Sequence, residues 1–201
     1  MFIQTEETPN PATMKFLPGC EVIGSGTADF PNRESAERSP LATKVFEISE
    51  VSGVFLGADF VTVTKSADVD WQVLKPAVLG AIMDHFTSGS PVINESLSGV
   101  HASGDGENEE IISQIVELLD TRVRPAVAMD GGDIVFHGFE SGVVYLHMQG
   151  ACSGCPSSTV TLKMGIENLL KHYVLRFKKC RLYHRIWIKV VAQSVPGLLN
   201  N

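Results

Sequence analysis

Residues 130–158 read DGGDIVFHGFESGVVYLHMQGACSGCPSS, and this stretch decides the fold of the second half of the chain. Residues 134–139 and 143–148 are two apolar runs, rich in the β-branched and aromatic side chains that favour strands. Residues 140–142, Glu-Ser-Gly, are typical of a tight turn between strands. The stretch therefore predicts a strand and a return strand, followed by a glycine-rich loop that holds two cysteines.

Helical patterns flank this pair of strands. Upstream, apolar residues recur at helical spacing over residues 111–123, and Pro125 lies near the end of this predicted helix. Downstream, a second helical pattern is carried by Val160, Leu162, Ile166, Leu169 and Leu170. The predicted order is helix, strand, strand, cysteine loop and helix, which is an α+β arrangement.

The cysteine loop is the most specific chemical signal in the chain. Cys152 and Cys155 leave a strand and enter a helix, so both thiols can point at one soft metal centre. Gly150 and Gly154 allow the backbone to bend, and Pro156 suits the first helical turn. Backbone N–H groups at the start of the helix favour thiolate over thiol.

Two chemistries fit this pair poorly. A structural zinc site needs four ligands, and the chain has no second Cys-x-x-Cys pair. His137 and His147 lie on the neighbouring strands but are not spaced as a ligand set. Two cysteines without any chemical role are also a poor explanation, because the pair is spaced regularly and is accompanied by glycines and a proline.

Two chemistries remain open for Cys152 and Cys155. A thioredoxin-like redox pair usually lies in a strand–helix–strand unit, which the two strands before the loop do not supply. An iron–sulfur cluster generally takes four thiolates, so two chains would have to meet around one cluster. A cluster shared in this way is lightly held and lies near solvent, which favours delivery to another protein over permanent storage.

The composition limits the classes of partner. The chain has 201 residues, 44% of them hydrophobic and 19% charged, as in a soluble globular protein. No apolar stretch reaches the roughly 18 residues of a membrane-spanning helix. All 23 acidic residues lie within the first 167 residues, and such an acidic body argues against a nucleic-acid groove. We expect neither a membrane nor a nucleic acid among the partners.

The cysteine content and the N-terminus predict a compartment. Four cysteines are too few for a disulfide scaffold, which favours a reducing interior. Residues 1–11 are acidic, whereas a secretory signal or a transit peptide is basic. The sequence therefore predicts that the chain stays where it is made.

The chain divides at a segment poor in core-forming residues. Residues 98–107 are small, polar and acidic with three glycines, which predicts a flexible linker. We expect a first α+β domain over residues 1–97 and a second over residues 108–174. Residues 175–201 form a basic tail, because 7 of the 16 lysines and arginines follow residue 167.

The first half has an α+β pattern of its own. Helices are predicted to begin at Ser39-Pro40 and at Asp70, the second with a late start or a kink because Pro76 lies inside it. Strands are predicted over residues 2–5, 14–17, 54–56 and 60–64.

No residue of the first half forms a chemical motif. Cys20 has no second thiol or histidine nearby in the sequence, so we expect a small, buried or half-buried hydrophobic residue. His85 and His101 are also isolated, and we expect both on the surface.

The sequence resembles a known family on several long motifs. Residues 129–136 (MDGGDIVF) and 150–159 (GACSGCPSST) are similar to the NifU C-terminal-type domain. Residues 2–11 (FIQTEETPNP) and 15–19 (KFLPG) are similar to the Nfu N-terminal domain. The resemblance covers nearly all of residues 1–174 and implies an Nfu-type iron–sulfur scaffold or carrier.

The resemblance implies a specific mode of action. Cys152 and Cys155 of each of two subunits would hold one 4Fe–4S cluster, with 2Fe–2S as the other cluster type, and pass it to apo-proteins. The chain would be a homodimer when loaded, would receive the cluster from upstream assembly proteins, and would not be an enzyme. A chain that begins at this motif is similar to bacterial members, which implies the cytoplasm. The mitochondrial matrix would apply only if a presequence is missing from this chain.

Two features stand apart from the resemblance. Glycines and aspartates at residues 130–133 are expected to shape and cap a turn, a structural role, instead of touching the cluster. After residue 174 the family continues with Pro-Glu-Val, whereas this chain becomes basic. The codons CTG-AGG-TTC-AAG-AAG-TGC, preceded by C and read one base earlier, give Pro-Glu-Val-Gln-Glu, so we hypothesise a one-base frameshift near residue 175.

The sequence therefore predicts a cluster scaffold that acts through Cys152 and Cys155. One alternative is a dithiol/disulfide oxidoreductase that uses the same pair. The other is a protein-interaction module in which the first half docks a partner and the cysteines are incidental.

Overall fold

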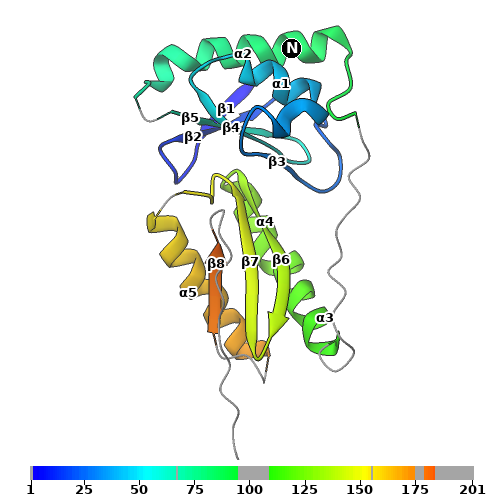
Figure 1. The fold of residues 1–201 in the computed structure, drawn as a ribbon, viewed down its shortest axis with the longest axis vertical. Helices are drawn as coiled ribbons and strands as arrows, with labels where there is room; N and C mark the ends of the chain where they lie inside the picture. The colour runs from blue at the N-terminus through cyan, green and yellow to red at the C-terminus, as the bar shows by residue number, and fades with distance from the viewer. Residues whose placement is uncertain (1, 67, 95–108, 155, 175–178, 184–201) are drawn as a thin grey trace, which may run out of the picture.

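The computed structural model describes residues 2–66, 68–94, 109–154, 156–174 and 179–183, and it contains two α+β domains (Figure 1). We call residues 2–94 the first domain and residues 109–183 the second domain. This confirms the α+β class and the two-domain organisation expected from the sequence. The predicted linker at residues 98–107 lies outside the described residues, as does His101.

The first domain is an antiparallel sheet with helices on one face (Figure 1). The strand order is β1-β2-β5-β4-β3, with β1 at Gln4–Glu7, β2 at Thr13–Leu17, β3 at Ala28–Phe30, β4 at Val51–Leu56 and β5 at Val61–Lys65. The helices are η1 at Ser35–Arg38, α1 at Pro40–Phe46 and α2 at Trp71–Ser88. The strands predicted over residues 54–56 and 60–64 are β4 and β5, while β3 was not predicted, because three residues are too few to show a periodic pattern.

Side-chain caps start both main helices, as the sequence predicts. The Ser39 hydroxyl accepts the N–H of Ala42 at 3.1 Å, and the Asp70 carboxylate accepts the N–H of Gln72 at 2.8 Å. The predicted late start of α2 is wrong, because the helix begins directly after its cap and includes Pro76. Buried Leu74 before the proline holds the first turns against the core.

His85 lies inside the first domain, so its predicted surface position is wrong. It is 2% exposed on α2, and its Nε2 atom has no hydrogen-bond partner. The ring packs edge-to-face on Phe86, with 5.5 Å between centroids. Helical spacing places His85 on the same buried face as Val78 and Ile82, which a lone histidine in a sequence does not reveal.

We expect the stability of the first domain to fall as the pH falls through 6.5, the ordinary pKa of histidine. Burial, together with the nearby charge of Lys44, lowers the pKa of His85 in the folded state. The unfolded chain therefore binds more protons, and acid favours unfolding. Urea unfolding followed between about pH 7.5 and pH 5.5 should show this slope, and His85→Leu should flatten it. An unchanged slope in His85→Leu would assign the effect to other groups.

The second domain is a three-stranded sheet with helices against one face (Figure 1). The strand order is β6-β7-β8, with β6 at Gly132–Glu140, β7 at Val143–Gly150 and β8 at Lys179–Tyr183. The helical segments are α3 at Glu109–Leu118, the π-helical η2 at Leu119–Val123, α4 at Arg124–Met129 and α5 at Pro156–Tyr173. The predicted helix over residues 111–123 thus continues to Met129, because Pro125 lies in the first turn of α4, where a missing N–H costs little.

A strand from the basic tail completes the second domain. β8 pairs in parallel with β7, with Val143 opposite Lys179 and His147 opposite Tyr183. Together β7, α5 and β8 form a strand–helix–strand unit with the cysteine loop at its first turn. The sequence analysis found no strand–helix–strand unit around the cysteine loop, and this is wrong. The second strand of the unit is β8, which lies within residues 175–201, the segment described as a basic tail. Among the described residues, no helix has the length and apolar character to cross a bilayer.

Candidate metal centre

The cysteine loop turns sharply between the end of β7 and the start of α5. Gly150 and Gly154 have positive φ angles of 61° and 92°, which glycine adopts without strain. The N–H of Ser153 donates to the carbonyl of Gly150 at 3.0 Å and closes the turn. Pro156 begins α5, as the sequence predicts. Of the two predicted ligands, Cys152 lies within the described residues and Cys155 lies outside them.

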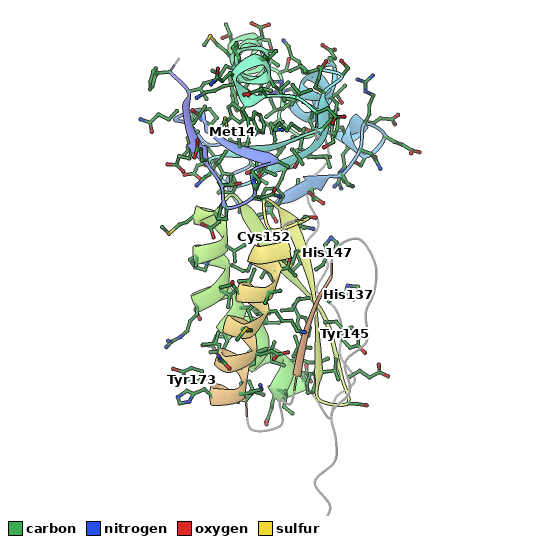
Figure 2. All side chains as sticks on the ribbon, turned by 90° about the vertical axis from the view of Figure 1, so that its left-hand side faces the viewer. Met14, His137, Tyr145, His147, Cys152 and Tyr173 are labelled. Atoms are coloured by element: carbon green, nitrogen blue, oxygen red, sulfur yellow. The ribbon has the colours of Figure 1, made fainter. Side chains whose placement is uncertain are left out.

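Cys152 lies at the top of the second domain, next to the first domain (Figure 2). It is 5% exposed and packs with the core of the second domain, which includes Ile134 and Ile166. Its Sγ faces Gly132, where a Cβ atom would lie only 2.8 Å away. Gly132 therefore lets the start of β6 pass directly beside the thiol.

Replacing Gly132 with alanine is expected to destabilise the second domain by about 1–3 kcal/mol and to displace the cysteine loop. The new methyl group would lie 2.7 Å from the carbonyl oxygen of Gln149 and 3.0 Å from the N–H nitrogen of Cys152, both backbone atoms. Urea unfolding measures the resulting loss in the free energy of unfolding. Gly138→Ala is the matched control on the same strand, since nothing lies within 4 Å of the added methyl. Equal stabilities of the two variants would contradict this packing.

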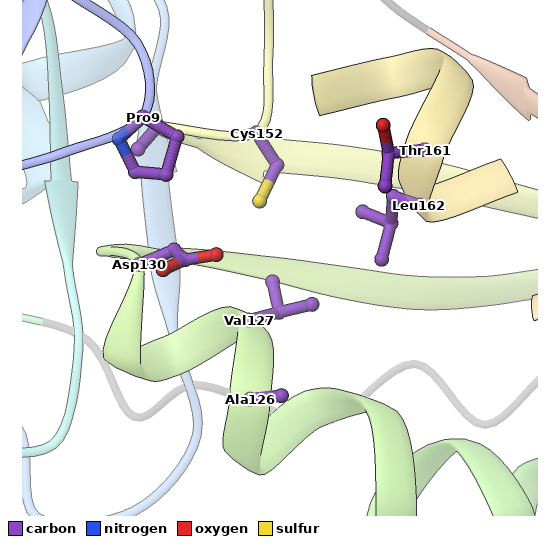
Figure 3. Close-up of a pocket in the computed structure, with 8 residues that line it drawn as sticks. Pro9, Ala126, Val127, Asp130, Cys152, Thr161 and Leu162 are labelled. Carbon is purple, nitrogen blue, oxygen red and sulfur yellow. The ribbon is translucent and has the colours of Figure 1, made fainter. Parts of the chain in front are cut away.

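A pocket opens beside the Cys152 thiol (Figure 3). It has a volume of about 390 Å³ and is lined by Pro9 of the first domain and by residues of α4, α5 and the two turns between them. Asp130 and Val127 line one side, and Leu162 lines the other. The thiol is therefore buried in the fold but borders a space shared by both domains.

In the turn at residues 130–133, Gly131 and Asp133 have the structural role that the sequence predicts. Gly131 has a φ angle of 82°, and the Asp133 carboxylate accepts the N–H of Ile134 at 2.7 Å. The Asp133 side chain is buried, with 3% of the residue exposed. It also accepts two hydrogen bonds from Arg124, from Nε at 2.8 Å and from Nη2 at 2.7 Å. The hydrogen bonds that Arg124 donates to the Asp133 carboxylate raise the pKa of Arg124 above its ordinary value, so this guanidinium is always charged. Asp133 thus ties α4 to the start of β6.

The remaining candidate ligands are not gathered at Cys152. His137 and His147 lie along the sheet (Figure 2), and His147 pairs with Val135 across the hairpin. Cys20 is exposed in the first domain, so the expectation of a buried or half-buried residue is wrong. Its position after Gly19, which has a φ angle of 75°, places it on a surface turn. Within the part of the chain that the structure describes, no three His, Cys, Asp or Glu side chains are placed to hold a metal ion.

Sequence reasoning missed the residues of the first domain that reach the cysteine loop and the turn at residues 130–133. Asn10 donates from Nδ2 to the carbonyls of Ala151 at 3.3 Å and Ser153 at 3.2 Å. Thr62 donates to the carbonyl of Gly131 at 2.7 Å. Both side chains are buried although polar, but their sequence contexts, a turn and an alternating strand, show nothing of a contact with residues so far along the chain.

Both halves of the chain match known protein families. Residues 3–89 match the family described as "Scaffold protein Nfu/NifU N terminal", and residues 115–180 match the "NifU-like domain". The second match ends inside β8, so it includes part of the segment that the sequence analysis set apart as a tail. The frameshift near residue 175 stays a hypothesis.

Curated relatives resemble the chain over most of its length. The NFU1 iron-sulfur cluster scaffold homolog, mitochondrial, of Drosophila sechellia is 53% identical over 175 residues, which are 87% of this chain and 62% of that protein. The human protein of the same name is 50% identical over 175 residues, 87% of this chain and 68% of that protein. NifU-like protein 4, mitochondrial, of Arabidopsis thaliana is 54% identical over 182 residues, 89% of this chain and 64% of that protein. The chain thus spans about two thirds or less of the length of these relatives.

These relatives overturn one expectation from the sequence. The insect, human and plant proteins are all named mitochondrial, so the expected bacterial cytoplasmic location is wrong. The acidic composition of residues 1–11 does not decide the compartment, because a targeting pattern is informative only where a sequence contains one.

The relatives also bear on the two chemistries left open for the cysteine pair. The strand–helix–strand unit fits a redox loop, but the Drosophila and human relatives carry the name of a cluster scaffold and not of an enzyme. With both family domains in the same order and about half of the aligned residues identical, the chain belongs to the Nfu/NifU family of iron–sulfur cluster scaffold proteins.

Proposed function

We propose that the protein holds an iron–sulfur cluster between two subunits, with Cys152 and Cys155 of each as the ligands, and transfers it to apo-proteins. The observation that supports this most is the position of Cys152, whose thiol borders a pocket at a sharp loop. The scaffold names of the relatives support the class of cargo. A 4Fe–4S cluster has four irons that each take a terminal ligand, so two cysteine pairs complete it.

The proposed action is binding and ligand exchange, not catalysis. The loop offers thiolates that incoming cysteines can replace one at a time, so the cluster moves without a change in its oxidation state. In this proposal each chain supplies only its cysteine pair as ligands; among the described residues, no three His, Cys, Asp or Glu side chains are placed to hold a metal ion. A cluster bound by few protein ligands is well suited to release. The partners are then apo iron–sulfur proteins and the assembly proteins that load the scaffold.

Anaerobic reconstitution with iron, sulfide and a thiol tests this function. We expect a brown protein with broad absorption near about 400 nm, and transfer of the cluster to an apo-protein acceptor. A colourless protein that instead reduces insulin disulfides would favour the dithiol oxidoreductase.

Cluster loading is expected to change the oligomeric state. Ligand counting predicts about one 4Fe–4S cluster per two chains, so the apo-protein should be mainly monomeric and the loaded protein mainly dimeric. Size-exclusion chromatography with light scattering, combined with iron and sulfide analysis, measures both. A loaded monomer with a full iron content would contradict a bridging cluster. A dimer that persists after chelation would show that protein contacts hold the chains together.

A further inference from the structure

The face of the first sheet that α1 and α2 leave open lies against the second domain (Figure 1). Lys15, Thr62 and Phe55 are cross-strand partners on β2, β5 and β4, so their side chains share one face. Phe55 is 1% exposed, and Thr62 is fully buried. Burial on the face opposite the helices comes from contact with the second domain.

Side chains of this face donate hydrogen bonds to the turn between α4 and β6, which lies beside Cys152. Thr62 donates to the carbonyl of Gly131, and the Lys15 ammonium donates to that of Met129, at 2.7 Å and 3.1 Å. The second acceptor is the last residue of α4, where a positive charge is favourable. Near the edge of the face, the Thr27 hydroxyl donates to the Asp133 carboxylate at 2.7 Å. The donors lie on the first domain and the acceptors on the second, so the two surfaces are chemically complementary.

The glycines of this turn and of the cysteine loop allow this close approach. A Cβ atom on Gly131 would lie 2.8 Å from the Thr62 hydroxyl, and one on Gly150 would lie 2.9 Å from the Phe55 ring. Any side chain at either position would push the domains apart. These glycines therefore serve the contact between domains as well as the shape of their own turns.

The same contact closes over the cysteine loop. Asn10 binds the carbonyls on both sides of Cys152, those of Ala151 and Ser153, and Pro9 lines the pocket that the thiol faces. Cys152 itself is 5% exposed: it packs in the core of the second domain and borders this pocket. Asn10 thus holds the backbone on both sides of Cys152.

We propose that the open face of the first sheet is a docking surface for the cysteine loop of its own chain, and that the docked domain covers Cys152 until a cluster is loaded. The inference rests on the proposed function for the identity of the cargo. A cluster shared by two subunits needs the loops of two chains to face each other. The first domain must therefore leave the loop before the second chain can approach.

Two near-isosteric substitutions separate docking from folding. Asn10→Asp keeps the oxygen that accepts the N–H of Ala12 at 3.1 Å, so the local turn is retained. It places a carboxylate oxygen where the amide donated to two carbonyls, which repels the loop. Thr62→Val removes the donor to Gly131 without changing the size of the side chain. Asn32→Asp is the matched control, with the same charge change at an exposed turn of the first domain.

The test is the rate of Cys152 alkylation by iodoacetamide in the reduced, full-length apo-protein, read by mass spectrometry of the modified peptide. Exposed Cys20 is the internal reference. We expect the Cys152 rate to rise about tenfold in Asn10→Asp, to rise also in Thr62→Val, and to stay unchanged in Asn32→Asp. Circular dichroism confirms that each variant is folded. Equal Cys152 rates in the wild type and in both interface variants would overturn the docking proposal.

Alkylation uses no iron, so its outcome is independent of whether the protein binds a cluster. Reconstitution then tests the link to function. Faster cluster uptake by Asn10→Asp than by Asn32→Asp supports a cover that must open. Equal uptake rates, with faster alkylation only in Asn10→Asp, would overturn the claim that docking controls loading. If no variant takes up a cluster, the proposed function fails, whereas the docking result stands on the alkylation rates.

Discussion

Replacing Cys152 with serine is expected to abolish cluster retention after anaerobic reconstitution, and Cys155→Ser should do the same. A serine hydroxyl has a far higher pKa than a thiol and is a hard ligand, so it does not replace a thiolate on iron. One substitution per chain removes two of four ligands from a bridging cluster, because both subunits carry the change. Iron and sulfide content after desalting, together with visible absorption, measures retention.

Cys20→Ser is the matched control for both variants. Cys20 is exposed on the first domain, and we expect this variant to bind as much cluster as the wild type. Circular dichroism and urea unfolding show whether each variant is folded, which matters for Cys152 because its side chain packs in the core of the second domain. Stoichiometric cluster in a folded Cys152→Ser protein would remove this residue from the ligand set.

Replacing Asp133 with alanine is expected to lower the free energy of unfolding of the second domain by about 2–3 kcal/mol. The carboxylate is 4% exposed and accepts hydrogen bonds from Arg124, from Thr27 and from the N–H of Ile134. Its loss leaves buried donors unpaired, including a charged guanidinium that is only partly exposed. Urea unfolding followed by circular dichroism measures the difference.

Asp120→Ala is the control for the Asp133 variant. Asp120 also pairs with Arg124, at 3.0 Å, but its side chain is 50% exposed. Exposed ion pairs contribute at most about 1 kcal/mol, so we expect a small effect. A loss in Asp120→Ala as large as that in Asp133→Ala would show that burial does not set the strength of these contacts.

The sequence alone predicted the parts of this structure that depend on neighbouring residues. Apolar runs rich in β-branched and aromatic side chains predicted β6 and β7, and helical spacing after the cysteines predicted α5. The caps at Ser39 and Asp70 and the turn at Gly131 were also predicted, because each follows from the conformation and hydrogen bonding of a few adjacent residues. The Cys152 loop was found in the same way, through glycine and proline next to two thiols.

Only the tertiary structure decided the features that depend on distant residues. β8 has a basic composition that does not predict a strand. It forms because it pairs with β7, more than thirty residues earlier in the chain. His85 is buried and Cys20 is exposed. Whether other elements pack over a single side chain depends on the tertiary structure and cannot be predicted from an isolated residue in the sequence. The contact of Asn10 with the cysteine loop joins residues 141 and 143 positions apart. Hydrogen bonds of this kind form between the surfaces of two folded domains. No local pattern in the sequence predicts which residues of the two surfaces come into contact.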